Sequence, residues 1–133
     1  MIVKTIRTCF PIAAAAVSDK AEEINKLNVF PVPDGDTGTN MSLTLASVTK
    51  ELSALPADAD MEAIAGAITH GSLMGARGNS GVITSQILRG VAEGLVSVDE
   101  PITSADIAHA FRRAVKVAFQ AVRKPIEGTI LTV

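Results

Sequence analysis

Two acidic residues in a segment rich in helix-breaking residues are the first candidates for chemistry. Asp34 and Asp36 lie in the sequence PDGDTGTN, residues 33–40, with Gly35 between them. Carboxylates two residues apart in non-helical backbone can point to the same side, and glycine lets the backbone bend around an ion. Mg²⁺ typically takes one or two protein carboxylates and leaves its other positions to water and phosphates. The pair therefore predicts a magnesium site.

A helix is expected to begin directly after this pair. Its free N–H groups and positive dipole end would attract phosphate, and Thr37, Thr39 and Asn40 add short hydrogen-bonding side chains there. The alternative is a plain turn and helix cap, because turns and caps use the same residue types. An EF-hand calcium loop is excluded, because position twelve counted from Asp34 is Leu45 rather than glutamate.

A second glycine-rich segment, GARGNSG at residues 75–81, precedes another expected helix. It is not a Walker P-loop, because it lacks the Lys-Ser/Thr ending and follows a helix rather than a strand. Its backbone N–H groups can still bind an anion, with Asn79 or Ser80 as the cap. Arg77 either neutralises phosphate or pairs with a surface carboxylate, and the whole segment is by itself equally compatible with an interhelical turn. The two loops, however, hold five of the ten glycines, and because glycine is costly in a helical protein this favours ligand recognition.

Few residues outside these loops offer nucleophilic or base chemistry. His70 and His109 fall on expected helices, and we interpret both as structural. The single cysteine, Cys9, excludes an intramolecular disulfide and a CxxC site. We expect Cys9 to be a small core residue.

The spacing of apolar residues, by three and four with no strand-like alternation, predicts an all-α fold. We expect a first helix at 11–27, divided by a capping box of Asp19 and Glu22. A second helix should run from Thr37 or Thr39 to about 53. A third should start at about 60, with glycines 71 and 75 loosening the chain after it. Two more are expected at 80–94 and from a capping box of Thr103 and Asp106 to just before Pro125. The expected core stripes of the first and last helices are Phe10, Ala13, Val17, Ala21, Ile24, Leu27 and Ile107, Phe111, Ala114, Ala118, Val122.

Length and composition limit the class of protein. The 133 residues fit one domain, residues 1–133, and the net charge of −2 without Trp or Tyr argues against a nucleic-acid partner. No apolar run approaches the ~18 residues of a membrane span. The N-terminus imitates a secretory signal, but the helical stripe runs through the supposed cleavage region. With a single cysteine the chain fits a reducing compartment, and we expect a cytoplasmic protein.

Three strings in this sequence carry a family resemblance: LNVFPVPDGDTGTNM at 27–41, LMGARGNSGVI at 73–83 and KPIEGTILTV at 124–133. In the same order and spacing, they closely resemble the nucleotide-binding domain of the fatty acid kinase ATP-binding subunit, which is homologous to the L subunit of dihydroxyacetone kinases. The resemblance implies an antiparallel helical barrel, of about eight helices in the family, with ATP and two Mg²⁺ at one end.

The resemblance also implies roles for individual residues. Asp34 and Asp36 match two of the three aspartates that hold the metals in dihydroxyacetone kinases, and the third position falls near Asn28, which is neutral. Thr39, Asn40, Gly78, Asn79 and Ser80 would touch phosphates, and Thr129 would face the nucleotide. The other loop residues complete the candidate nucleotide contacts: Thr37, Gly38, Gly75, Arg77 and Gly81.

The implied activity is phosphoryl transfer from ATP to a fatty acid carboxylate presented by a partner protein, giving an acyl phosphate. A carboxylate is already ionised at neutral pH and needs no general base, so the protein has to position the reactants and neutralise charge. Alternatives are the L subunit of a dihydroxyacetone kinase, which usually has a histidine after the DGD, and a non-catalytic nucleotide-binding, metal-binding or interaction module.

By the same resemblance the seventh helix of the family would begin near Val133, so we expect its last two helices and a nucleotide-covering loop to be missing from these 133 residues. We also expect the partner protein to dock on regions outside them. Self-association and weak nucleotide affinity are then expected of the chain, because apolar faces would be left uncovered at Phe10, Val17, Ile24, Ile107, Phe111 and Val122.

Overall fold

The computed structural model describes residues 2–29 and 33–121, and within them the chain forms six α-helices and no strand. The all-α prediction is therefore confirmed. The helices are α1 (Ile2–Asp19), α2 (Ala21–Lys26), α3 (Thr37–Ser53), α4 (Met61–Gly75), α5 (Gly78–Val96) and α6 (Ser104–Ala121).

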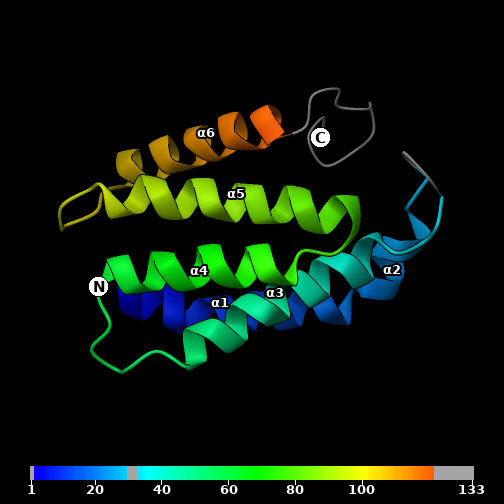
Figure 1. Cartoon of the computed structure of the whole chain (residues 1–133), viewed down its shortest axis with the longest axis horizontal. Helices are drawn as coiled ribbons and strands as arrows, with labels where there is room; N and C mark the ends of the chain where they lie inside the picture. The colour runs from blue at the N-terminus through cyan, green and yellow to red at the C-terminus, as the bar shows by residue number, and fades with distance from the viewer. Residues whose placement is uncertain (1, 30–32, 122–133) are drawn as a thin grey trace.

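The helices pack as an open row rather than a closed ring. Helices α3, α4, α5 and α6 each pack against the next and alternate in direction, while α1 and α2 both pack against α3 (Figure 1). Over the described ranges, α1 and α6 stand at the two edges of the row and do not contact each other. The start of α3, the end of α4 and the start of α5 consequently meet at one end of the molecule (Figure 1).

Two kinds of packing hold this row together. Large apolar residues at helical spacing form the core between α3 and α4, where Val48, Leu52, Ile64 and Ile68 are all buried. Small residues let α5 and α6 approach closely instead: a Cβ added at Gly90 would lie 2.5 Å from the Cα of Ala114. A second contact of this kind joins Gly94 to Ala110.

The first helix differs from the prediction at its start. Helix α1 begins at Ile2 rather than at residue 11 and contains Pro11 in its interior. Val3, Ile6 and Phe10 pack against the core, and the Arg7 guanidinium donates a hydrogen bond to the Leu55 carbonyl at 2.9 Å. These tertiary contacts outweigh the loss of one helical hydrogen bond at the proline.

The predicted division at residue 19 is present, but its cause is not a capping box. Lys20, not Asp19, precedes α2, and it makes no side-chain capping bond. The apolar stripe of α1 and α2 is also only partly buried: Leu27 is 78% exposed. Helix α1 contains no fully buried residue. Cys9 is exposed, so the prediction that it is a core residue is wrong. The reason is that α1 is an edge helix with one covered side.

Helices α4 and α5 are longer than predicted. Gly71 and Gly75 continue α4 to its end, because a glycine allows α3 to come close: a Cβ at Gly71 would lie 2.9 Å from the Cα of Val48. Helix α5 begins at Gly78, two residues before the predicted Ser80, and ends at Val96.

The last helix confirms its predicted cap but not its predicted stripe. The Thr103 N–H donates to Asp106 Oδ2 at 2.9 Å, and the Asp106 N–H donates to Thr103 Oγ1 at 3.2 Å, a reciprocal capping box. Ala114 and Ala118 are buried as expected, together with Ala110, but Ile107 and Phe111 are exposed. The helix turns its small residues toward the glycines of α5, which leaves its larger apolar residues outside. Within the described residues, no helix is long and apolar enough to cross a membrane.

Candidate functional site

The structure brings the two predicted loops together at one end of the helix row. The Ser80 hydroxyl, at the start of α5, donates to the Thr37 carbonyl, at the start of α3, with an oxygen–oxygen distance of 3.2 Å. Gly78 lies directly against the Asn40 side chain, because a Cβ at Gly78 would be 2.3 Å from Asn40 Nδ2. Segments some forty residues apart therefore form one surface.

Most glycines of these loops have a packing reason. Added Cβ atoms would meet Ala21 O at 2.2 Å from Gly38, Ser47 Cβ at 2.3 Å from Gly75 and Thr44 Oγ1 at 2.7 Å from Gly81. Close helix approach thus accounts for these three positions without a ligand, and the glycine count alone does not identify a binding site. Gly35 and Gly78 differ, since their φ values of 67° and 65° are backbone conformations that other residues rarely adopt.

The acidic pair has the character of a cation site. A hydrogen bond with Asp36 raises the pKa of Asp34, and partial desolvation and the neighbouring negative charge of Asp36 raise it further. Two carboxyl groups this close repel each other when both are ionised, and a bound cation would remove that repulsion. Both residues thus fit a hard cation such as Mg²⁺.

The ligand set offered by the protein is small. Where the structure describes the chain, no three or more His, Cys, Asp and Glu residues gather as a metal-binding group. A cation held by Asp34 and Asp36 would therefore keep most of its positions for water or phosphate oxygens. That is the usual arrangement for Mg²⁺ at a nucleotide.

The N-terminus of α3 is capped from within the protein, contrary to the expectation of free N–H groups there. Asn28 Oδ1 accepts from the N–H groups of Asp36 and Thr37, both at 3.2 Å. Asn25 Oδ1 accepts from the Thr39 N–H at 3.1 Å, and Asn25 Nδ2 donates to Thr39 Oγ1 at 3.0 Å. Asn28 as a metal ligand stays a prediction, and in this structure its oxygen binds backbone.

Asn25 was not among the residues predicted from the sequence. The signal available was the spacing of two asparagines three residues apart, in NKLN, immediately before the loop. Asparagine is a common cap residue, but a cap is usually sought directly before its helix. Here it comes from the preceding helix, through tertiary contact.

The N-terminus of α5, in contrast, has no side-chain cap among the residues that the structure describes. Arg77 precedes the helix and makes no side-chain capping bond. Of the first four backbone N–H groups, that of Gly81 bonds to the Arg77 carbonyl at 3.0 Å. Those of Gly78, Asn79 and Ser80 have no acceptor among the residues that the structure describes. Unpaired N–H groups at the positive end of a helix attract anions.

Arg77 contacts backbone carbonyls in this structure, and its expected role at a phosphate stays a prediction. Its guanidinium donates to the carbonyl oxygens of Ala76 at 3.0 Å and Met74 at 3.4 Å. These carbonyls lie at the C-terminal end of α4, where a cation is favourable. The side chain is exposed and lies between the end of α4 and the start of α5.

A buried hydroxyl supports the loops from behind. Thr44 is fully buried, and its Oγ1 donates to the Asn40 carbonyl at 2.8 Å and lies 3.3 Å from the Gly75 carbonyl. The same oxygen faces Gly81. Thr44 therefore joins α3, the end of α4 and the start of α5, a role that no pattern in the sequence predicted.

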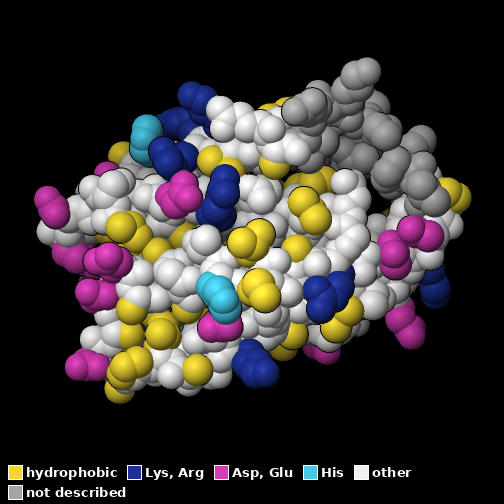
Figure 2. Space-filling model, in the orientation of Figure 1, with side chains coloured by type: hydrophobic (Ala, Val, Ile, Leu, Met, Phe, Trp, Pro, Cys, Tyr) yellow, Lys and Arg dark blue, Asp and Glu magenta, His cyan; other side chains and the backbone are white. Residues whose placement is uncertain are grey.

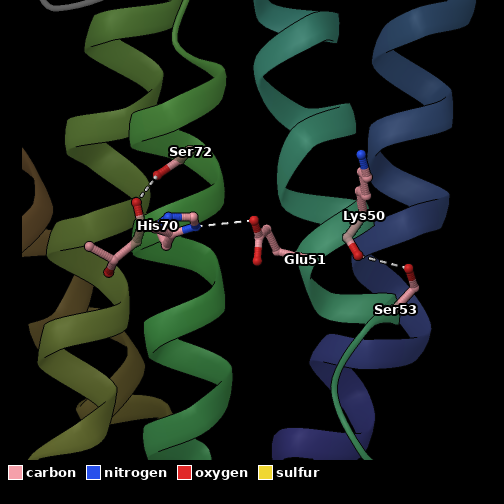
Figure 3. Close-up of polar contacts among 6 residues, drawn as sticks. Lys50, Glu51, Ser53, His70 and Ser72 are labelled. Carbon is pink, nitrogen blue, oxygen red and sulfur yellow. Dashed lines mark hydrogen bonds and ion pairs between the residues drawn. The ribbon is translucent and has the colours of Figure 1, made fainter.

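The histidines lie away from the two loops, as interpreted from the sequence. His70 Nδ1 is 3.1 Å from Glu51 Oε1, and this pair links α4 to α3 (Figure 3). The nearby hydroxyls of Ser72 and Ser53 bond to carbonyls of their own helices. His109 is exposed on α6. Neither histidine is positioned as a base for the loops.

An open apolar groove of about 500 Å³ runs between α4 and α5. Apolar side chains are scattered over this face of the molecule (Figure 2). The groove contains none of the predicted site residues, and it is lined by Glu62, Ala65, Gly66, Thr69, His70, Leu73, Glu93 and Val96. Thr129, Val122 and residues 30–32 lie outside the described residues, so the predicted nucleotide contact of Thr129 stays a prediction.

Over the described residues, the chain belongs to the class of all-α domains, and it has an acidic pair and an uncapped helix N-terminus at one end. Residues 31–133 match the family model of the DAK2 domain. The chain belongs to this family, a kinase-related module like the L subunit of dihydroxyacetone kinases.

The chain is also similar to curated bacterial proteins. Protein YloV of Bacillus subtilis (strain 168) is 48% identical over 120 residues, which are 90% of this chain and 21% of that protein. An uncharacterized protein of Staphylococcus aureus (strain USA300) is 47% identical over 120 residues, 90% of this chain and 22% of that protein. The chain thus spans about one fifth of the length of these relatives.

Proposed function

We propose that this chain is the Mg·ATP-binding domain of a kinase that phosphorylates a fatty acid carboxylate presented by a partner acyl-binding protein. The contact between Ser80 and Thr37 carries the proposal. It joins an uncapped helix N-terminus, suited to phosphate, to a pair of carboxylates suited to Mg²⁺. Membership of the DAK2 family supports a kinase-related role for the domain as a whole.

Each group at this end has a role in the proposal. Asp34 and Asp36 hold the cation, which when bound neutralises charge on the phosphates. The N–H groups of Gly78, Asn79 and Ser80 bind phosphate oxygens. Thr39 and Asn40 add polar side chains from α3.

The carboxylate acceptor is the finer part of the proposal. A fatty acid is ionised at neutral pH, so its transfer needs orientation and charge neutralisation but no proton acceptor. The pairing of His70 with Glu51, away from the loops, agrees with a site that uses no histidine base. The partner would dock on regions outside these 133 residues, since the relatives are about five times as long as the matched segment.

An L subunit of a dihydroxyacetone kinase is the second candidate, because the DAK2 match is shared by both branches. Its substrate carries a hydroxyl group rather than a carboxylate. Release of ADP with an acyl-loaded partner, but not with the dihydroxyacetone-loaded subunit, would favour the fatty acid reading. The reverse result would favour the second.

Titration calorimetry tests the shared core of both. We expect saturable heat with Mg·ATP and little heat with ATP in EDTA. Equal affinity with and without divalent metal would contradict the role of the acidic pair. No binding of nucleotide under any condition would leave only an interaction domain.

A further inference from the structure

The short helix α2 and the segment directly after it are fixed against the start of α3 by three contacts. Gly38 lies against Ala21, where a Cβ would be 2.2 Å from the carbonyl oxygen. Asn28 caps the N–H groups of Asp36 and Thr37. Asn25 makes two hydrogen bonds to Thr39, one to its backbone N–H and one to its hydroxyl oxygen.

The two bonds between Asn25 and Thr39 determine each other's direction. A backbone N–H can only donate, so the atom of Asn25 that faces the Thr39 N–H must be the oxygen. The atom 3.0 Å from Thr39 Oγ1 is then the amide nitrogen, which can only donate. The Thr39 hydroxyl oxygen is therefore the acceptor in this bond, and its own proton is directed elsewhere.

The hydroxyl proton of Thr39 has no acceptor among the residues that the structure describes. Thr39 is exposed on the first turn of α3. One residue further on, the Asn40 side chain lies against Gly78 in the second loop. A hydroxyl that donates at this position would suit an anionic oxygen.

We propose that Asn25 is a positioning residue that makes the Thr39 hydroxyl a hydrogen-bond donor to the phosphates of the nucleotide. This rests on the proposed function, because it assumes Mg·ATP at the two loops. Asn25 itself does not touch the ligand. It acts through the direction of one proton.

The decisive variant is Asn25→Asp, which has nearly the same shape. A carboxylate still accepts from the Thr39 N–H, but it also accepts the hydroxyl proton of Thr39 instead of donating to that oxygen. The thermal midpoint should stay close to that of the wild type, while affinity for Mg·ATP should fall about tenfold, as for loss of one hydrogen bond to a charged group. A purely structural role would move stability and not this affinity.

A double-mutant cycle separates proton direction from the added charge. Thr39→Val removes the hydroxyl and should weaken Mg·ATP binding about as much as Asn25→Asp, whereas Thr39→Ser should bind normally. Adding Asn25→Asp to Thr39→Val should then cause little further loss. If the carboxylate acted only by repelling phosphate, its effect would persist in the Thr39→Val background, and that result overturns the proposal.

Calorimetry on the full chain, with Mg·ATP over a micromolar to millimolar range, supplies the affinities. Should Asn25→Asp fail to fold, the Thr39→Val and Thr39→Ser pair decides alone: equal affinity in both overturns the assignment of Thr39 as a donor. A wild type that does not bind Mg·ATP overturns the proposed function and this inference with it. A wild type that binds while both Thr39→Val and Asn25→Asp bind equally well overturns only the inference.

Discussion

Gly78 and Asn40 are in such close contact that there is no room between them for a methyl group. A Cβ on Gly78 would lie 2.3 Å from Asn40 Nδ2 and 3.1 Å from its Cγ. Gly78 also has a φ of 65°. The glycine therefore serves both the turn that begins α5 and the contact with α3.

Gly78→Ala should lower the free energy of unfolding by at least ~1–2 kcal/mol, the usual cost of a left-handed conformation for a residue with a Cβ. It should also displace the Asn40 side chain. Gly66→Ala is the matched control, because Gly66 is in α4 with nothing within 4 Å of an added Cβ. That change should be neutral or stabilise by ~0.5–1 kcal/mol. Urea unfolding of both variants checks this, and equal stability would contradict it.

Asp34→Asn and Asp36→Asn should each weaken Mg·ATP binding by more than the ~10–100-fold typical of residues that only support a metal ligand. Helix content by circular dichroism should not change, because both side chains lie before α3 and outside the core. Asp58→Asn, at an exposed aspartate in the loop between α3 and α4, is the control. Near-normal affinity in either loop variant would refute the magnesium site.

Ser80→Ala should cost about 1 kcal/mol of stability, because it removes the hydrogen bond to Thr37. Mg·ATP affinity should fall less than in either aspartate variant, since one neutral hydrogen bond is lost and no charge. Ser85→Ala is the control, because Ser85 is also a buried hydroxyl on α5 but donates to the Val82 carbonyl of its own helix. A larger affinity loss in Ser80→Ala than in Asp34→Asn would contradict this ranking.

The capping box of α6 should make stability depend on pH. Bonds from the Thr103 N–H and hydroxyl lower the pKa of Asp106 below its ordinary 3.8. The ionised carboxylate therefore stabilises the fold above that ordinary value, and the contribution is lost as the pH falls through the lowered one. Thermal melting of the wild type and Asp106→Asn should differ at neutral pH and converge in strong acid. A constant difference at all pH values would contradict the assignment.

The exposed stripe on α6 should cause the chain to associate. Phe111 is 53% and Phe119 43% exposed, on the same side of the helix as Ile107 and Val115. Burying a large apolar side chain is worth ~1.5–3 kcal/mol. Light scattering should find association in the wild type and less association in the double variant Phe111→Ser, Phe119→Ser. Leu43→Ser, at an exposed leucine on α3, is the control and should have little effect. A wild type that is monomeric at every concentration would rule this out.

Local sequence determined the helical class and several helix ends. Three helix starts agree with the prediction from short polar residues at the start of apolar series. Helix α3 begins at Thr37, and α4 and α6 begin directly after Asp60 and Thr103. Such caps depend on contacts within three or four residues, so they can be read from the chain. The acidic pair was found for the same reason, since Asp34 and Asp36 are only two residues apart.

Tertiary structure decided the rest. Helix α1 continues through Pro11 because Val3, Ile6 and Phe10 pack against the core. On α6 the buried side consists of alanines, and Ile107 and Phe111 are exposed. At the site, Asn25 and Thr44 act through contacts to segments fourteen and thirty-one residues away. Helical periodicity identifies an apolar side but does not show which neighbour covers it, and a polar side chain reveals its partner only after the helices have packed.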